Sequence, residues 1–349
     1  MKRFAFAVPG DLATPTGGYA YDRSIIAELQ RMGWRIDVVD VGGDFPRPSL
    51  PTLDAARAVL AAVAPGMPIV IDGLAFGAMP EIAAELAETH RLIALVHHPL
   101  ALETGLSGAE ADRFRRCERA ALAAASCVIV TSPATARLLE AGYGVAREKV
   151  TVVLPGNEPR PAAHGSHDGT VALLAVGSLV PRKGYDVLIA ALAELKDLSW
   201  RLVVAGDRTR DPATARQLDA DIRRLGLGDR IDVLGAVTEQ RLVDLYAQAD
   251  AFVLASRFEG YGMAFAEAIA YGLPVIGTDA GAISDTVPHG AGLLVPPDDV
   301  PTLVRALWKV IAFPEERARL AAAARAAAAR LPTWRQSAAQ FAKAIEAVR

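Results

Sequence analysis

Short apolar runs alternate with longer segments of helical periodicity through the first 154 residues. The apolar runs predict strands at 4–8, 35–39, 69–71, 92–96, 127–131 and 150–154. The segments between them predict helices at 21–32, 53–63, 80–89, 108–125 and 133–141. Strands that alternate with helices of this length form right-handed βαβ units around a parallel sheet covered on both faces. The first part of the chain is therefore expected to be a doubly wound α/β domain.

Prolines, glycines and polar residues without periodicity fill 155–169, which is typical of an exposed interdomain linker. The alternation then restarts, with strands predicted at 171–176, 200–205, 231–234, 251–254, 274–277 and 292–295. Helices are predicted at 184–195, 211–225, 239–248 and 301–313, and two more are predicted to begin near 263 and at 334. The alanine-rich segment 315–330 is predicted to be a solvated surface helix. We expect two Rossmann-like domains, 1–160 and 161–333, with ligands at the carboxyl ends of the strands.

The segment 256–285, SRFEGYGMAFAEAIAYGLPVIGTDAGAISD, contains a glycine-bearing loop between a buried strand and a helix. Such a turn places an anion against the free backbone N–H groups of the helix N-terminus. Glu259 in the loop and Glu267 on the helix are unexpected beside a phosphate alone, and ligand hydroxyls would give them partners. The structural alternative is that Glu267 accepts hydrogen bonds from backbone amides.

Composition narrows the class of protein. The chain is 52% hydrophobic and 22% charged with a formal charge of -3, which indicates a well-cored soluble protein and argues against a general nucleic-acid binder. Two cysteines make a disulfide framework unexpected and favour a reducing compartment. No apolar run approaches a membrane span, and the first is too short for a signal peptide, so a cytoplasmic protein is expected.

Two features of the first domain are candidates for chemistry. Gly17 and Gly18 precede the first predicted helix and would let the backbone approach a ligand, although a flexible loop with a helix cap explains them equally well. His97 and His98 follow the strand RLIALV at its carboxyl end, without a recognisable metal spacing, so we favour a substrate contact or proton relay. A nearby basic cluster is interpreted as a solvated helix face, with a membrane-surface or anionic-acceptor patch as the alternative; its members are Arg113, Arg115, Arg116 and Arg119.

In the second domain, VGSLVPRKGYD ends a strand and opens a helix. Arg182 and Lys183 stand just before Gly184, where cations beside a helix N-terminus would compensate the charge of a departing diphosphate. The spacing is not that of a P-loop, and surface loops often carry such a sequence.

Taken together, these features resemble the retaining GT-B glycosyltransferases of family 4, the glycosyl transferases group 1. The resemblance spans nearly the whole chain: the Gly17-Gly18 loop, the histidine after a first-domain strand, GSLVPRKG, AGD at 205–207, and EGYGMAFAE followed by AYGLPVIGTDAGA. The last of these is similar to the family's E-x7-E motif. It implies an α/β GT-B architecture of two Rossmann-like domains facing across a cleft, the first on the acceptor side and the second binding the donor. The final helix, 334–349, is expected to cross back onto the first domain.

The resemblance implies roles for individual residues. Glu267 would bind the donor ribose, Glu259 would lie by the transferred sugar and diphosphate, and Lys183 would neutralise the diphosphate. His97, with His98 as the alternative, would contact the sugar near the reacting centre. The remaining donor-site residues would be Gly177, Ser178, Arg182, Gly260, Tyr261, Gly262 and Met263. The family often has arginine where Ser178 stands, and its GGxxE is here GAISD, so whether Arg182 replaces the missing arginine is left open.

The implied reaction is transfer of a sugar from a nucleoside-diphosphate sugar, with retention and without a metal or other cofactor, through a front-face route. The acceptor is left open among glycans, lipids and small metabolites, as are peripheral contact with the inner face of a membrane and the oligomeric state. Two alternatives remain: a GT-B-like nucleotide-binding protein that no longer transfers, favoured only by Ser178, and a nucleotide-sugar epimerase.

Overall fold

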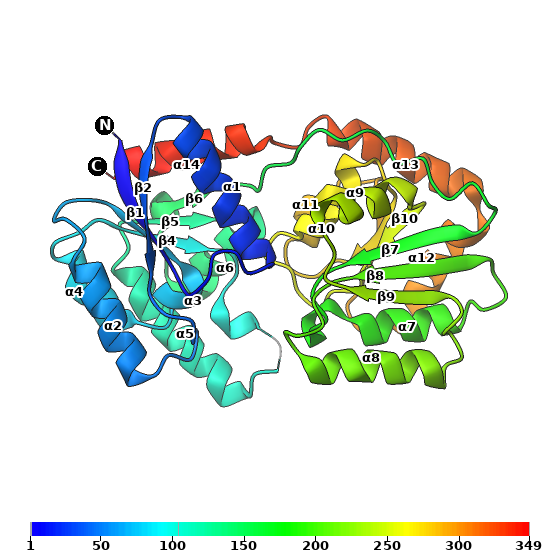
Figure 1. Ribbon diagram of the computed structural model, residues 1–349, viewed down its shortest axis with the longest axis horizontal. Helices are drawn as coiled ribbons and strands as arrows, with labels where there is room; N and C mark the ends of the chain where they lie inside the picture. Colours follow the sequence, from blue (N-terminus) through cyan, green and yellow to red (C-terminus); the bar gives the residue numbers. More distant parts are fainter. Residues whose placement is uncertain (1, 104, 349) are drawn as a thin grey trace. The chain divides into compact units, whose positions relative to one another are not determined.

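A computed structural model describes residues 2–103 and 105–348 of the chain and divides it into two compact units (Figure 1). Unit 1 runs to Gly156 and resumes at Pro332, and unit 2 comprises Asn157–Leu331. The division expected after residue 160 thus falls four residues earlier. The reason is that the segment after Gly156 runs along unit 2, where the N–H groups of Ala163 and His164 donate to the carbonyls of Tyr271 and Ala247.

Unit 1 is built on a six-stranded parallel sheet in the order β2-β1-β3-β4-β5-β6. The strands are β1 (Arg3–Val8), β2 (Arg35–Asp40), β3 (Ile69–Asp72), β4 (Leu92–Val96), β5 (Cys127–Val130) and β6 (Val150–Val152). One face carries α1 (Gly17–Arg31) and α14 (Trp334–Ala347), which pack on each other (Figure 1). The other face carries α2 (Leu50–Ala61), α4 (Pro80–Ala87), α5 (Gly108–Ala123) and α6 (Pro133–Tyr143), with the short helices α3 (Gly73–Phe76), η1 (Leu100–Leu102) and η2 (Arg147–Lys149) in connections.

The burial of the strands explains their sequence pattern. β3, β4 and β5 are buried at every residue, because helices cover both faces, and they therefore read as continuous apolar runs. β2 lies at the sheet edge and exposes much of its length. The Phe6 ring stacks on Phe341 of α14 at 6.4 Å between centroids, which fixes the last helix to the first strand. Both cysteines are free thiols, and Cys127 is a buried residue of β5.

Unit 2 has the same construction, with strand order β12-β11-β10-β7-β8-β9. Its strands are β7 (Val171–Val176), β8 (Trp200–Ala205), β9 (Ile231–Gly235), β10 (Ala251–Val253), β11 (Val275–Thr278) and β12 (Gly292–Val295). The helices α7 (Tyr185–Ala193), α8 (Pro212–Arg224) and α12 (Val300–Ala312) cover one face. The helices α9 (Glu239–Gln248), α10 (Met263–Ala270) and α13 (Pro314–Ala328) cover the other, and η3 (Pro181–Lys183) and α11 (Ile283–Thr286) are short connecting turns.

One expectation is wrong. The glycines at 17 and 18 do not form a loop before the first helix, because Thr16 caps α1 by accepting a hydrogen bond from the N–H of Tyr19, and α1 starts at Gly17. The alanine-rich helix α13 lies on the surface as expected, and it packs on α10 through one buried stripe of Leu320, Ala324 and Ala327.

Candidate functional site

The topology of unit 2 singles out one edge of its sheet. The chain leaves β7 toward β8 on one side, and it later enters β10 on the other side of β7. The carboxyl ends of such a pair, where the strand order reverses, form the ligand-binding position of doubly wound sheets. Gly177 and Ser178 follow β7, and the loop 254–262 follows β10. The predicted donor-site residues of unit 2 therefore come from two neighbouring strand ends and the helices that follow them.

Glu259 is the centre of an ion cluster at this edge. Its Oε1 accepts from Lys183 Nζ at 2.6 Å and from the Ser256 hydroxyl at 2.6 Å, and its Oε2 lies 3.3 Å from Arg182 Nη1. The residue is 6% exposed. Burial alone would disfavour its charge, but the two cations and the hydrogen bonds lower the pKa of Glu259 to about 2. Glu259 is therefore ionised at neutral pH, and its two cationic partners leave the cluster with one excess positive charge.

Two glycines with positive φ allow this cluster to form. Gly184 (φ 64°) ends the turn that carries Arg182 and Lys183, and a Cβ there would lie 1.9 Å from the carbonyl oxygen of Ala255. Gly281 (φ 64°) packs its backbone on Glu259, where a Cβ would lie 2.3 Å from the Glu259 carbonyl oxygen. The next residue, Ala282, donates its N–H to that carbonyl at 2.9 Å. The GAISD sequence therefore keeps the glycine that the geometry needs.

Helix α10 presents an N-terminus without a side-chain cap. Gly262 (φ 90°) precedes it, and within residues 2–103 and 105–348 no side chain caps its first turn. Met263 and Ala264 are half-buried, whereas Gly260, Tyr261 and Gly262 are buried. Because uncapped N–H groups and the helix dipole favour an anion, this end of α10 suits a phosphate group.

Glu267 lies on α10 and is half-buried. Its Oε2 accepts from the Tyr246 hydroxyl at 3.0 Å, and burial raises the pKa of the carboxyl group. Among the described residues no backbone amide donates to the Glu267 carboxylate, so the alternative of a purely backbone-bonding side chain is wrong. Glu267 is held by one hydroxyl, while Glu259 is held by two cations, so the two acids have different environments.

The strand end at Gly177 and Ser178 is fixed by its neighbours. The Tyr185 hydroxyl donates to the Gly177 carbonyl at 2.6 Å, and a Cβ on Gly206 would lie 1.8 Å from the same oxygen. Leu179 donates its N–H to the carbonyl of Asp207 at 2.8 Å, so the AGD sequence supports this turn. Arg182 lies with Lys183 at Glu259 and also donates to the Phe258 carbonyl at 2.8 Å. A guanidinium is therefore present in the cluster although Ser178 lacks one.

In unit 1, His97 follows β4 and meets two carboxylates. Its Nε2 lies 3.2 Å from Asp22 Oδ1 and 3.5 Å from Asp72 Oδ2. A Cβ on Gly18 would lie 3.2 Å from the His97 ring, so the glycine permits close approach of the histidine to α1. His98 instead lies 3.2 Å from Glu103 Oε2. The structure therefore brings Gly18 to His97 and turns His98 toward its own loop.

Sequence reasoning did not identify Asp22, Asp72, Ser256 or Tyr246. A signal existed for Asp22, which occupies the buried stripe of α1 with Ile25, Ile26 and Leu29. A charged residue on such a stripe needs a partner. Asp72 ends the apolar run of β3, the same strand-end position that drew attention to His97.

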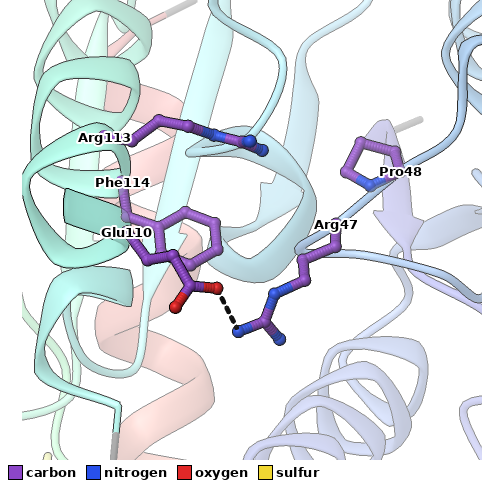
Figure 2. A pocket seen from close by; sticks show the side chains of 5 residues that line it. All are labelled: Arg47, Pro48, Glu110, Arg113 and Phe114. Atoms are coloured by element: carbon purple, nitrogen blue, oxygen red, sulfur yellow. Dashed lines mark hydrogen bonds and ion pairs between the residues drawn. The ribbon is translucent and has the colours of Figure 1, made fainter. Parts of the chain in front are cut away.

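The basic cluster of α5 is exposed, as expected: Arg113, Arg115, Arg116 and Arg119 all face solvent. Arg113 also lines a hollow of about 280 Å³ with Arg47, Pro48, Glu110 and Phe114 (Figure 2). In this hollow Arg47 pairs with Glu110 at 3.3 Å, and the guanidinium groups of Arg47 and Arg113 lie 5.7 and 5.8 Å from the Phe114 ring centroid.

None of the helices in the described part of the chain combines the length and the apolar character that a membrane span needs.

Comparison with protein families gives two matches. The model for "Glycosyl transferases group 1" matches residues 157–327, and that for "Glycosyl transferase 4-like domain" matches 42–156. The two matches meet where the structural units divide.

Curated relatives include mannosylfructose-phosphate synthase of Agrobacterium fabrum, 33% identical over 47% of this chain and 40% of the relative. D-inositol 3-phosphate glycosyltransferase of Xylanimonas cellulosilytica is 32% identical over 64% and 57%, respectively. MMP alpha-(1->4)-mannosyltransferase of Mycolicibacterium hassiacum is 28% identical over 85% and 74%. The chain thus spans about half the length of the first two.

Solved structures show the fold. Sucrose-phosphate synthase from Thermosynechococcus elongatus superposes with a TM-score of 0.83 at 22% identity over 99% of both chains. Anabaena HepE in complex with UDP-glucose superposes with a TM-score of 0.79 at 20% identity, over 99% of this chain and 100% of HepE. With the two family matches and the paired doubly wound units, these likenesses confirm the predicted architecture. The chain therefore consists of a glycosyl transferase 4-like domain at 42–156 followed by a glycosyl transferases group 1 domain at 157–327, and it has the GT-B fold.

Proposed function

We propose that the protein transfers a sugar from a nucleoside-diphosphate sugar to an acceptor, with retention of anomeric configuration and without a metal. The observation that carries the proposal is the Glu259 cluster with Lys183 and Arg182, at the β7–β10 strand ends. Its excess positive charge and the uncapped N-terminus of α10 suit a diphosphate, which gains charge as the sugar departs. Unit 2 is accordingly the donor unit and unit 1 the acceptor unit.

Each donor-site residue has a part in this proposal. Lys183 and Arg182 stabilise the leaving diphosphate, and the backbone from Gly260 to Met263 contacts phosphate and sugar. Glu259 lies by the transferred sugar while it orients the two cations. Glu267, held by Tyr246, retains acceptor capacity for the ribose hydroxyls. Gly177 and Ser178 form the opposite side of the phosphate position.

The reaction that we propose breaks the bond between the anomeric carbon and the diphosphate oxygen and forms a bond from that carbon to an acceptor oxygen on the same face. The acceptor proton passes to the leaving diphosphate, which balances the step without a cofactor. Stabilisation of the diphosphate and positioning of the acceptor supply the rate enhancement. His97 of unit 1 contacts the sugar near the reacting carbon.

For the acceptor, the names of two relatives and one structural neighbour contain a phosphorylated small molecule. The hollow at Arg47 and Arg113 in unit 1 offers guanidinium groups to such an anion (Figure 2). We therefore propose small sugar or polyol phosphates as the first acceptor class to test. Glycan and lipid acceptors are the other outcomes of that screen, and sedimentation with anionic vesicles tests peripheral membrane contact.

The test is a thermal-shift panel of nucleoside diphosphates and nucleotide sugars, followed by transfer assays with and without EDTA. HepE was solved with UDP and UDP-glucose, so uridine nucleotides come first. We expect stabilisation by at least one nucleotide, transfer that survives EDTA, and a product whose anomeric configuration matches the donor. Stabilisation by no nucleotide would overturn the proposal. Binding without transfer to any acceptor would favour the non-transferring alternative, and interconversion of the donor sugar would favour the epimerase.

A further inference from the structure

His97 is held by two buried carboxylates that come from different elements. Asp22 lies in the second turn of α1, and Asp72 ends β3, which pairs with β4 in a register that sets Asp72 opposite Leu95. The side chain of Asp22 is 0% exposed and that of Asp72 is 1% exposed. Both carboxylates approach the same ring atom, Nε2, at 3.2 and 3.5 Å.

The remaining carboxylate oxygens show that this arrangement is built around the ring. Asp72 Oδ1 accepts the N–H of Leu74 at 2.8 Å, but Asp22 Oδ2 is buried without a hydrogen-bond partner among the described residues. A buried carboxylate with one orphaned oxygen needs a nearby cation, because desolvated charge is costly unless it is compensated. Among the described residues, His97 is the only group that hydrogen-bonds to the Asp22 carboxylate.

The ring itself has little freedom. Gly18 lies against one side, and the Tyr21 ring meets it edge-on at 5.3 Å between centroids. Thr131 donates its hydroxyl to the His97 carbonyl at 3.3 Å, which fixes the backbone. The other ring nitrogen, Nδ1, has no hydrogen-bond partner within residues 2–103 and 105–348.

We infer that Asp22 and Asp72 are positioning residues that hold His97 through a protonated Nε2, so that Nδ1 is the ring atom that donates to the substrate. An unprotonated Nε2 would direct its lone pair at two carboxylates, which is electrostatically repulsive. With Nε2 protonated and two buried anions beside it, the ring is an imidazolium, and both of its nitrogens are donors. His97 is then a fixed cationic donor and not a general base. The inference rests on the proposed function only in naming a substrate at Nδ1.

The electrostatics of the surroundings agree with this state. Burial disfavours the imidazolium, but the charges and hydrogen bonds of Asp22 and Asp72 outweigh it and raise the pKa of His97. Burial raises the pKa of Asp22 as well, and His97 and Arg23 oppose that rise. Arg23 is occupied by the carbonyls of Leu12 and Thr14. Asp22, Asp72, Arg23 and the neutral Tyr21 are the titratable or charged groups that face the ring from α1 and β3.

The test is an NMR titration of the full chain with ¹⁵N-labelled histidine, in which the His97 signals are assigned through His97→Gln. We expect His97 to stay doubly protonated across neutral pH, with a pKa at least one unit above an ordinary histidine. Asp22→Asn should lower that pKa by more than one unit, and Asp72→Asn, which keeps an oxygen for the Leu74 cap, should lower it less. Asp37→Asn is the matched control. Asp37 lies on the edge strand β2 and pairs with Arg3 of β1, so its substitution should leave the pKa of His97 unchanged.

A second readout is the pH profile of kcat/KM. Asp22→Asn should add an alkaline limb near the new pKa of His97, and the limb should be absent from His97→Gln, which has no titrating ring. A purely structural role of Asp22 would lower activity without creating that limb. The inference is overturned if His97 titrates like an ordinary histidine, or if ¹⁵N shifts place the proton of a neutral ring on Nδ1.

The three side chains also have the types that ligate a divalent cation. Addition of Zn²⁺ or Mn²⁺ distinguishes this case, since metal binding at Nε2 requires an unprotonated nitrogen. No change of the His97 signals at equimolar metal supports the inference, and stoichiometric perturbation of them contradicts it. Because the NMR readouts, with and without metal, do not require turnover, they remain decisive if the proposed transfer fails.

Discussion

The two units hold buried ion clusters of opposite composition. In unit 1 a histidine lies between two carboxylates, Asp22 and Asp72, and in unit 2 a carboxylate, Glu259, lies between Arg182 and Lys183. Both clusters sit at the carboxyl ends of parallel strands, where backbone turns away from the sheet and side chains of different elements meet. The Glu259 cluster carries an excess positive charge, and the His97 cluster carries an excess negative charge when its ring is protonated.

This difference in charge indicates which ligand group each cluster suits. A cation excess beside an uncapped helix N-terminus suits a diphosphate, whereas an acid-held imidazolium suits a neutral oxygen that needs a donor. Removing one member of a buried cluster leaves the others without compensation, which costs more than the pair contributes. Substitutions at the cluster centres should therefore have larger effects than substitutions at their supports.

The largest effect is expected for Glu259→Gln. The change keeps the shape of the side chain but leaves Lys183 and Arg182 without their counter-charge, so both cations lose their orientation. We expect kcat/KM for transfer to fall by about 100- to 1000-fold, the range seen when one electrostatic group of an active site is removed. Asp168→Asn is the control, since it removes an exposed ion pair with Arg201 in the same unit. A loss no larger than that of the control would show that Glu259 is only structural.

Lys183→Met should have the next largest effect. It removes a charge-assisted contact, worth about 1.5–3 kcal/mol, so nucleoside-diphosphate affinity measured by calorimetry should fall about 10- to 100-fold. Lys183→Arg should recover part of the loss, and Lys196→Met, at an exposed position, should cause none. If Lys183→Met binds the nucleotide as the unmodified protein does, Arg182 alone provides the positive charge of the site.

A fourth buried acid, Glu118, lies outside both clusters and has no cationic hydrogen-bond partner among the described residues. Glu118 of α5 accepts the Leu100 N–H at 3.0 Å, its Oε1 lacks a partner among the described residues, and burial raises its pKa to about 8. The folded state therefore binds more protons than the unfolded state between about pH 4.5 and 8, and stability should fall as pH rises through this window.

Glu118→Gln should flatten that dependence. Glu118 contributes at most about 1.4 kcal/mol per pH unit to the slope of the free energy of unfolding against pH, which urea unfolding measures. Glu85→Gln is the control because Glu85 is exposed and pairs with Arg57. The raised pKa would be contradicted if the free energy of unfolding did not fall between about pH 4.5 and 8 in the unmodified protein, or if Glu118→Gln showed the same pH dependence.

The smallest effect is expected for Tyr246→Phe, which removes only the hydroxyl that orients Glu267. A hydrogen bond to a charged group of this kind contributes about 1.5 kcal/mol, so donor affinity should fall about tenfold or less. Tyr271→Phe keeps the stacked ring pair, whose centroids are 5.1 Å apart, and should leave affinity unchanged. Equal effects of the two substitutions would mean that ring packing, not the hydroxyl, matters.

The sequence predicted the features that are local. Periodicity placed the strands within about two residues, because buried parallel strands are continuous apolar runs, and the loop position of Glu259 and helix position of Glu267 followed from the glycines between them. It missed the start of α1, since the Thr16 cap was read as part of a glycine loop.

The contacts between distant residues were out of reach. Nothing in the spacing shows that Lys183 and Arg182 are bound to Glu259, which lies 76 positions after Lys183. Likewise Asp22 meets His97 only because α1 packs at the strand ends of β3 and β4. These are products of strand order, which one sequence does not specify.

The central claim, that unit 2 binds a nucleoside diphosphate at Glu267 and the Glu259 cluster, is tested most directly by titration calorimetry of UDP and the other nucleoside diphosphates. The comparison is between the unmodified protein, Glu267→Ala and Asp168→Asn. We predict that at least one nucleotide binds the unmodified protein and Asp168→Asn equally, and that Glu267→Ala binds it at least about tenfold more weakly because the ribose loses its acceptor. Equal binding by Glu267→Ala, or binding of no nucleotide by the unmodified protein, would contradict the account.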